Sequence, residues 1–168
     1  MKLADVEAIL RALHEAEVRY LIVGGLAVVA HGYVRATVDV AIVLSLEESN
    51  ARSTMQALTA IGYQPLVPVN ALDFANEKIR KTWQEEKHMI VFQMRHPNRD
   101  STRLDLFVAE PFSFTEELAQ AKWEEVAGIR VPVLRLDRLL QMKRESGRPQ
   151  DLADVDQLTL IMENRKNE

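Results

Sequence analysis

The first third of the chain shows two different spacings of apolar residues. Val6, Ile9, Leu10 and Leu13 recur every three or four residues, which predicts an amphipathic helix over residues 4–16. The segments that follow are apolar runs bounded by glycine or polar residues, a pattern typical of buried strands and short buried helices. They predict a strand over 19–25, a short helix over 26–32, a strand over 36–44 and a helix that runs from a Ser45–Glu48 capping box to Ile61.

The remainder of the chain predicts strands first and helices last. Pro65 restricts 63–67 to an edge strand, and the pattern assigns no element to 69–86. The other predicted elements are two strands over 88–95 and 102–110 joined by a turn at 96–100, a helix over 114–123, a hairpin over 124–134, a helix over 138–146 capped by Asp137, and a helix over 150–164. This order predicts one α/β (α+β) domain over 1–168, a mixed sheet flanked by helices, with the core sheet at about 19–110 and a helical part at about 137–165.

Composition narrows the class of protein without naming a function. The chain has 168 residues, of which 47% are hydrophobic and 27% charged, as in an ordinary globular domain. It has no cysteine, which excludes disulfides and thiolate metal sites. Its net charge of −4 argues against a surface built throughout for nucleic acid, so no DNA partner is expected. Neither a signal peptide nor an apolar run of membrane-spanning length is present, so no membrane partner and a cytoplasmic location are expected.

Asp39 is the first residue that suggests chemistry. Side chains alternate between the two faces of a strand, so Asp39 shares a face with Thr37, Ala41 and Val43, whereas the opposite face is wholly apolar. A carboxylate in such a strand is costly unless something compensates its charge. One interpretation is an ion pair with a nearby arginine, such as Arg35 or Arg103. The other is a metal ligand.

Asp105 repeats this arrangement in a second strand. It is again a single carboxylate in an apolar run, with Leu104 and Leu106 on the opposite face. If the two strands are neighbours, Asp39 and Asp105 come together, and a divalent cation would relieve their repulsion. Oxygen ligands of this kind suit Mg²⁺ or Mn²⁺. The alternative is two surface aspartates that are paired independently.

Two further features favour a phosphate ligand only weakly. Gly24 and Gly25 stand between a strand and a short helix, where backbone N–H groups can approach a phosphate, although such pairs are usually tight turns. Lys143, Arg144 and Arg148 gather where one predicted helix ends and the next begins, and could hold a triphosphate or an RNA backbone. A solvated helical hairpin with a local Arg148–Asp151 pair is the simpler interpretation.

Taken together, these segments resemble a known family. "GGLAVVAHGYVRATVDVAIVL" is similar to the first motif of minimal nucleotidyltransferases of the polymerase-beta type, in which a glycine pair and an "HG..R.T" segment precede a strand with Asp-x-Asp. "RLDLFV" resembles their next strand, which carries a third carboxylate. "KRESGRPQDLADVDQL" resembles the C-terminal signature of the branch that includes AbiEii-type toxins. Residues 62–100 contribute nothing specific.

The resemblance implies a polymerase-beta-like nucleotidyltransferase fold and a role for each matched residue. Asp39 and Asp105 would bind the catalytic metals, Mg²⁺ or Mn²⁺, and Asp105 would also help to activate the attacking hydroxyl. Phosphates of the NTP substrate would lie against Gly24 and Gly25. Lys143 and Arg148 would contact the triphosphate. Asp151 and Asp154 would hold that helical region in place or touch the substrate.

Position 41 departs from the family pattern. The pattern requires a second carboxylate there, and this chain has Ala41, on the same strand face as Asp39. Loss of one of three carboxylates should weaken metal binding and reduce turnover by several powers of ten. Three explanations are open: an inactivated variant of an active enzyme, a natural pseudoenzyme, or a ligand supplied by another residue. The intact pattern around position 41 favours the first.

Three functions follow from the resemblance. The leading one is transfer of NMP from an NTP to an acceptor such as the 3′ end of tRNA or another RNA, by the toxin of a toxin–antitoxin or defence pair. The second is an antitoxin that adenylylates a partner toxin. The third is a module that binds nucleotide or a partner protein without catalysis.

Overall fold

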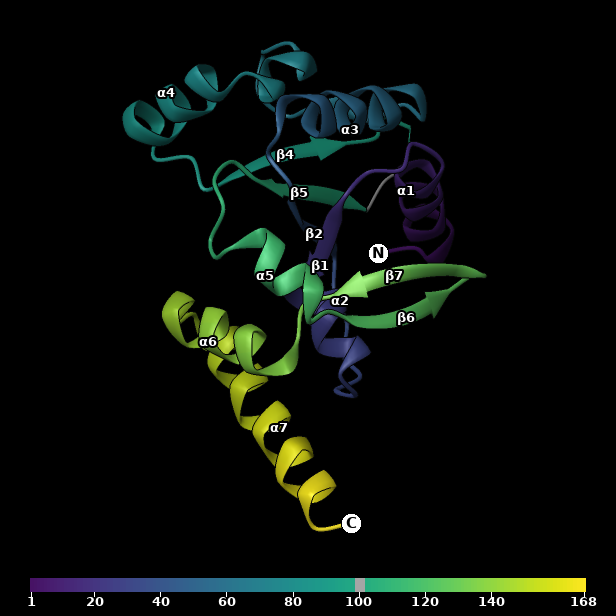
Figure 1. Cartoon of the computed structure of the whole chain (residues 1–168), viewed down its shortest axis with the longest axis vertical. Helices are drawn as coiled ribbons and strands as arrows, with labels where there is room; N and C mark the ends of the chain where they lie inside the picture. The colour runs from purple at the N-terminus through teal and green to yellow at the C-terminus, as the bar shows by residue number, and fades with distance from the viewer. Residues whose placement is uncertain (99–101) are drawn as a thin grey trace.

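The computed structural model describes residues 1–98 and 102–168, and its regular elements follow the predicted order closely (Figure 1). Within these residues the helices are α1 (Leu3–Glu15), α2 (Gly24–Ala30), α3 (Glu48–Ala60), the 3₁₀ helix η1 (Ala71–Ala75), α4 (Glu77–Lys87), α5 (Phe114–Ala119), α6 (Leu136–Ser146) and α7 (Pro149–Lys166). The strands are β1 (Tyr20–Val23), β2 (Asp39–Leu44), β3 (Gln64–Pro65), β4 (Val91–Arg95), β5 (Arg103–Phe107), β6 (Lys122–Val126) and β7 (Ile129–Val133).

The described strands form one mixed sheet, which confirms the predicted fold class. Its order is β3-β4-β5-β2-β1-β7-β6. β2 pairs in parallel with β5, and β1 with β7, whereas the other neighbours are antiparallel. The sheet therefore extends beyond residue 110, because the β6–β7 hairpin adds its two strands beside β1.

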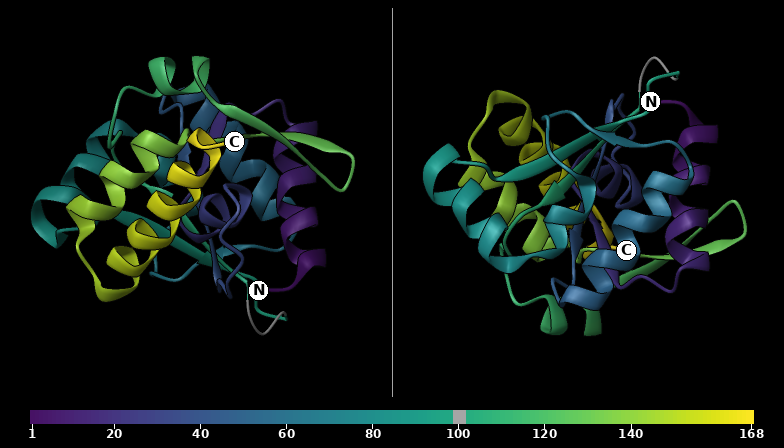
Figure 2. Two further views of the ribbon diagram at one scale, coloured as in Figure 1. Left: turned by 90° about the horizontal axis from the view of Figure 1, so that it is seen from below. Right: turned by 90° about the horizontal axis from the view of Figure 1, so that it is seen from above.

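The two faces of the sheet differ in polarity around Asp39 and Asp105. Val40 and Ile42 of β2 and Leu106 of β5 are fully buried on one face. α4 and η1 pack on this face, since the Trp83 ring stacks on Phe92 with centroids 5.2 Å apart and Phe74 lies 5.4 Å from the same ring. The other face carries Asp39, Ala41 and Asp105, all half-buried, and lies towards α2 and the α6–α7 hairpin (Figures 1 and 2). Burial of the first face stabilises the sheet, and the second is left for polar chemistry.

Three predicted helix boundaries are wrong. The Ser45–Glu48 capping box does not form: Glu47 precedes α3 without a capping hydrogen bond, and the Ser45 hydroxyl accepts a hydrogen bond from Arg19 instead. Asp137 lies inside the first turn of α6, after the N-cap Arg135. The helix predicted over 114–123 ends at Ala119, because β6 begins at Lys122 to pair with β7.

The region without a prediction, 69–86, is helical. Two asparagines begin its helices: the Asn70 side chain accepts a hydrogen bond from the Leu72 amide, and Asn76 accepts one from Ile79. Of the turn expected at 96–100, the last two residues lie outside the described residues. Within the described part of the chain, no helix combines the length and apolarity needed to cross a membrane.

Candidate nucleotide and metal site

Position 41 lies directly opposite Asp105 in the parallel pairing of β2 with β5. Asp39 lies opposite Arg103 in the same register, so Asp39 and Asp105 are diagonal neighbours on one face of the sheet. The predicted neighbourhood of the two strands is thus confirmed. The gap left by Ala41 falls between the two carboxylates that the family pattern assigns to metal binding.

Each of the two carboxylates has a partner from the chain. Arg103 Nε donates to Asp39 Oδ1 at 3.1 Å, and Gln93 Nε2 donates to Asp105 Oδ1 at 3.1 Å. The ion-pair interpretation of Asp39 is therefore realised with Arg103. The Asp39–Arg103 pair is partly exposed, so its contribution to stability is about 1 kcal/mol or less. A ligand cation would meet only modest competition from such a pair.

Burial raises the pKa of the Asp105 carboxyl, and the negative charge of Asp39 raises it further. The Gln93 hydrogen bond and the charges of Arg103 and Arg148 act in the opposite direction but do not cancel the shift. A raised pKa makes Asp105 a stronger proton acceptor than an ordinary surface carboxylate. Repulsion between Asp39 and Asp105 is also the electrostatic condition that a bound cation relieves.

The twin glycines lie against the same strand. Gly24 has φ +64°, and a Cβ built on it would lie 3.0 Å from Ala41 Cβ. A Cβ on Gly25 would collide with the Thr37 side chain, whose Oγ1 would be too close for any residue but glycine. These contacts give both glycines a packing reason: they let the start of α2 approach β2 and the segment before it. Their role in phosphate binding stays a prediction.

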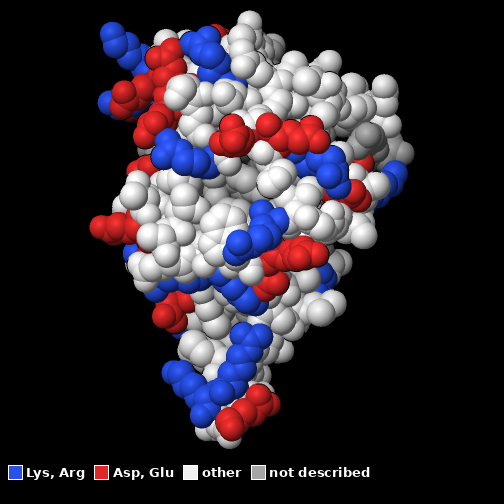
Figure 3. Space-filling view, turned by 45° about the vertical axis from the view of Figure 1, so that its right-hand side comes forward, with Lys and Arg blue, Asp and Glu red and all other residues white. Residues whose placement is uncertain are grey.

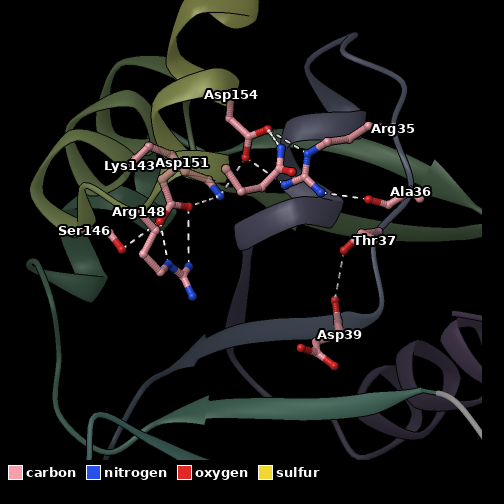
Figure 4. A network of polar contacts seen from close by, with 10 residues as sticks. Arg35, Ala36, Thr37, Asp39, Lys143, Ser146, Arg148, Asp151 and Asp154 are labelled. Carbon is pink, nitrogen blue, oxygen red and sulfur yellow. Dashed lines mark hydrogen bonds and ion pairs between the residues drawn. The ribbon is translucent and has the colours of Figure 1, made fainter.

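The C-terminal hairpin holds a network of ion pairs, here called the α6–α7 ion cluster and formed by Arg35, Lys143, Arg148, Asp151 and Asp154 (Figure 4). Lys143 Nζ lies 2.9 Å from an oxygen of Asp151 and 2.9 Å from one of Asp154. Arg35 donates two hydrogen bonds of 2.7 Å to the Asp154 carboxylate. These bonds connect the segment that precedes β2 to α7, and so help to position the start of the strand that carries Asp39.

Members of the α6–α7 ion cluster differ in their access to a ligand. Lys143 is buried and already paired with two carboxylates. The side chain of Arg148 is 75% exposed, although its Nε donates to Asp151 at 2.6 Å, and its charge acts on Asp105. Arg148 is therefore the cation of the cluster that can turn to a phosphate beside Asp105, whereas Lys143 and Asp151 are placed to hold the hairpin. Contact of Lys143 with the triphosphate stays a prediction.

Hydrogen bonding in the cluster sets its carboxylate pKa values. Burial by itself would raise the pKa of Asp151, but hydrogen bonds from Arg148, Lys143 and Ser146 outweigh it and leave the pKa well below its ordinary value. Burial would also raise the pKa of Asp154, but hydrogen bonds from Arg35, Lys143 and Gln150 outweigh it, so this pKa is lowered too. Both groups are ionised at neutral pH, so the buried Lys143 is fully compensated.

The donor set fits one hard cation better than two. No group of three or more His, Cys, Asp or Glu side chains in the described residues is arranged to hold a metal ion. A replacement ligand for Ala41 is accordingly not found in that part of the chain. Mg²⁺ is commonly held by one or two carboxylates together with substrate phosphates. Asp39 and Asp105 meet that requirement for a single Mg²⁺ or Mn²⁺ that arrives with a triphosphate.

The sequence analysis anticipated Arg103 as a possible partner of Asp39 but missed Gln93 as the partner of Asp105. Alternation along β4 places Gln93 on the face of Asp105, but only the antiparallel register of β4 with β5 makes them opposite neighbours. The signal available in the sequence was a polar residue set in an otherwise apolar strand. That signal indicates a face, and it does not indicate which residue across the sheet is the partner.

Comparison with solved structures identifies the fold. A lincomycin-bound lincosamide antibiotic adenylyltransferase, LnuA, superposes with a TM-score of 0.61 over 94% of this chain and 96% of its own, at 16% identity. ANT(2")-Ia in complex with adenylyl-2"-tobramycin gives 0.57 over 93% and 86%, at 13% identity. The chain has the nucleotidyltransferase fold.

A third match agrees with this. An antigenic nucleotidyltransferase-like protein from Paracoccidioides brasiliensis gives a TM-score of 0.56 over 93% of this chain and 74% of its own, at 17% identity. No protein-family model matches the sequence, and no curated protein does either. The nucleotidyltransferase fold is thus established by architecture, and nothing in these matches assigns the chain to the AbiEii toxin branch.

Proposed function

We propose that this protein is a metal-dependent nucleotidyltransferase in which Ala41 impairs catalysis. The observation that carries the proposal is that Asp39 and Asp105 lie on one face of the sheet, with Ala41 opposite Asp105. The charge of Arg148 also reaches Asp105, where it lowers the pKa of the carboxyl. The nucleotidyltransferase fold supports the reaction class. An arrangement kept at every position but one is the arrangement expected of an enzyme weakened at a single ligand.

The proposed reaction needs an acceptor hydroxyl and an NTP. The hydroxyl oxygen attacks the α-phosphorus, a new O–P bond forms, the bond from the α-phosphorus to its bridging oxygen breaks, and pyrophosphate leaves with those electrons. Asp105 takes the hydroxyl proton and passes it to solvent. Arg148 orients the triphosphate. A bound Mg²⁺ or Mn²⁺ held by Asp39 and Asp105 would supply positive charge to the phosphate oxygens.

The acceptor is the finer part of the proposal. Resemblance of the C-terminal motif to the AbiEii branch supports RNA, such as the tRNA 3′ end, and a toxin role. A small hydroxylated compound is the second candidate, because two structural neighbours are described with lincomycin and with adenylyl-2"-tobramycin. Figure 3 shows basic side chains with an acidic one beside them at the tip where α7 ends with Arg165 and Lys166, and both signs mixed over the rest of that face. A phosphate backbone would therefore find only a small basic area on this side.

A labelling experiment tests the reaction and its acceptor together. Wild-type protein and Ala41→Asp are incubated with each α-³²P-labelled NTP and Mg²⁺ or Mn²⁺, and with total tRNA, lincomycin, tobramycin or proteins that co-purify with the chain. Label on an acceptor, raised by orders of magnitude in Ala41→Asp, supports the proposal. Asp39→Asn in the Ala41→Asp background is the matched control and should remove the label. If the Ala41→Asp protein binds nucleotide but transfers it to no acceptor, the proposal is contradicted and the chain is a binding module without catalysis.

A further inference from the structure

A hollow of about 450 Å³ opens where β5 ends. Its lining comes from the C-terminal end of α4, the residues just before β4 and the segment that follows β5, which lie near one another at that end of the sheet (Figure 1). Its volume lies within the range of small-molecule sites. The residues that give it its chemistry are His88, Met89, Ile90, Phe107, Glu110 and Pro111.

The hollow borders the strand that carries Asp105, because Phe107 of β5 lines it. Phe107 is two residues beyond Asp105 on the same strand, so both lie on one face of the sheet. Two residues of a strand span about 7 Å. A molecule seated against Phe107 would therefore bring a substituent within reach of the Asp105 carboxylate, where the proposed reaction needs the acceptor hydroxyl.

The walls combine apolar surface with one carboxylate. Ile90 is 71% exposed, and Met89, Phe107 and Pro111 extend the apolar wall beside it. Glu110 contributes a carboxylate to the hollow. Among the described residues that line it, none is a lysine or an arginine. An RNA backbone finds no cation here, whereas a protonated amine finds a partner.

We propose that this hollow is the acceptor subsite and that it takes an amphipathic amino alcohol: an aryl or alkyl body against Ile90 and Phe107, an ammonium group towards Glu110, and a hydroxyl directed to Asp105. The proposal rests on the proposed nucleotidyl transfer, of which it names the acceptor class. It also implies that recognition of the acceptor does not depend on the residue at position 41.

Binding is tested first, on the wild-type chain without nucleotide, so that its outcome is separate from catalysis. Three naphthyl ethers serve as probes: propranolol, which is cationic; 3-(1-naphthyloxy)propane-1,2-diol, which is neutral; and 1-naphthoxyacetate, which is anionic. Methyl NMR spectra should show the Ile90 and Met89 signals shifting with propranolol, more weakly with the diol and least with the acetate. Absence of any shift at millimolar probe, or a preference for the acetate, overturns the proposal.

Surface variants locate the contacts without disturbing the core. Ile90→Gln should weaken propranolol binding by about tenfold, because it replaces apolar contact with polar surface. Leu3→Gln is the matched control, since Leu3 is 73% exposed on α1 and lies outside the hollow; it should leave the affinity unchanged. Glu110→Gln should weaken propranolol by about two- to fivefold and leave the diol unaffected. Equal losses for both probes would overturn the role of Glu110.

Catalysis supplies the second readout. In the Ala41→Asp background, propranolol should accept labelled AMP, and Ile90→Gln should raise its KM with little change in kcat. If Ala41→Asp labels tRNA and the naphthyl probes do not bind, the subsite proposal fails and the reaction stands. If the probes bind and no acceptor is ever labelled, the proposed function fails instead.

Discussion

Ala41 and Asp105 face each other across the parallel β2–β5 pair, and the methyl group of Ala41 stands where a carboxylate would meet that of Asp105. Gly24 follows the strand on the other side of Ala41 and has no Cβ to fill the space, since one would lie 3.0 Å from the methyl carbon. The glycine at position 24 thus keeps the β1 side of Ala41 free of a side chain, while Asp105 lies on its β5 side.

Asp105→Asn should stabilise the protein at neutral pH. The pKa of Asp105 is raised in the folded state, so above that pKa the ionised carboxylate costs folding free energy, and below the unfolded pKa of about 3.9 the cost disappears. Asparagine is neutral and keeps the shape of the group. Thermal unfolding should show a higher melting temperature for Asp105→Asn at pH 7, and the difference should shrink as the pH falls. A lower melting temperature at pH 7 would show that the carboxylate is not under electrostatic strain.

Arg103→Gln should free Asp39 for a cation. The Arg103 guanidinium occupies an oxygen of Asp39 at 3.1 Å, but the pair is partly exposed and weak. Its removal should tighten Mn²⁺ binding by about fivefold or less, measured by the electron paramagnetic resonance signal of free Mn²⁺. Arg130→Gln removes a cation from the opposite end of the sheet, where Arg130 stacks on Trp123, and is the control. If both variants bind Mn²⁺ alike, Arg103 is not a competitor.

Asp154→Asn should be strongly destabilising. Asp154 is fully buried, bridges Arg35 and Lys143, and leaves buried positive charge uncompensated when it is neutral. The free energy of unfolding should fall by about 3 kcal/mol. Glu48→Gln, which removes only an exposed pair with Arg52 four residues away, should cost about 0.5 kcal/mol or less. Similar losses in urea unfolding of the two variants would refute a special role for the α6–α7 ion cluster.

The same substitution predicts a pH dependence. The pKa of Asp154 is lowered in the folded state, so its stabilising effect is complete above the unfolded pKa of about 3.9 and is lost as the pH falls through the folded pKa. The difference in stability between wild type and Asp154→Asn should therefore be constant around pH 6–7 and narrow below about pH 4. A difference that stays constant down to pH 3 would contradict the lowered pKa.

Strand alternation carried most of what the sequence could predict about the site. A period of two placed Asp39 and Ala41 on one face of their strand and Asp105 on the polar face of its own, because the face of a residue within a strand follows from local geometry alone. The register of β4 with β5 cannot be deduced in this way, so Gln93 was missed as the partner of Asp105. Register depends on contacts between residues far apart in the chain.

Helix ends show the same limit. Pro149 begins α7, one residue before the predicted start at 150, because a fixed φ and a missing N–H suit the first helical position in any context. Ser45 had the local chemistry of a cap, but its hydroxyl is taken by Arg19 and its carbonyl by Asn50. A tertiary partner overrode the local preference there, and Asn70 and Asn76, whose caps are local, carried a signal that could have been recognised.

Mn²⁺ binding by Ala41→Asp tests the central claim most directly. The central claim is that Asp39 and Asp105 form a cation site that lacks one ligand. The restored carboxylate should therefore tighten Mn²⁺ binding by at least about tenfold, as measured from the electron paramagnetic resonance signal of free Mn²⁺. Asp39→Asn in the same background should reverse the gain. An Ala41→Asp protein that folds normally and binds Mn²⁺ no better than wild type would contradict the account.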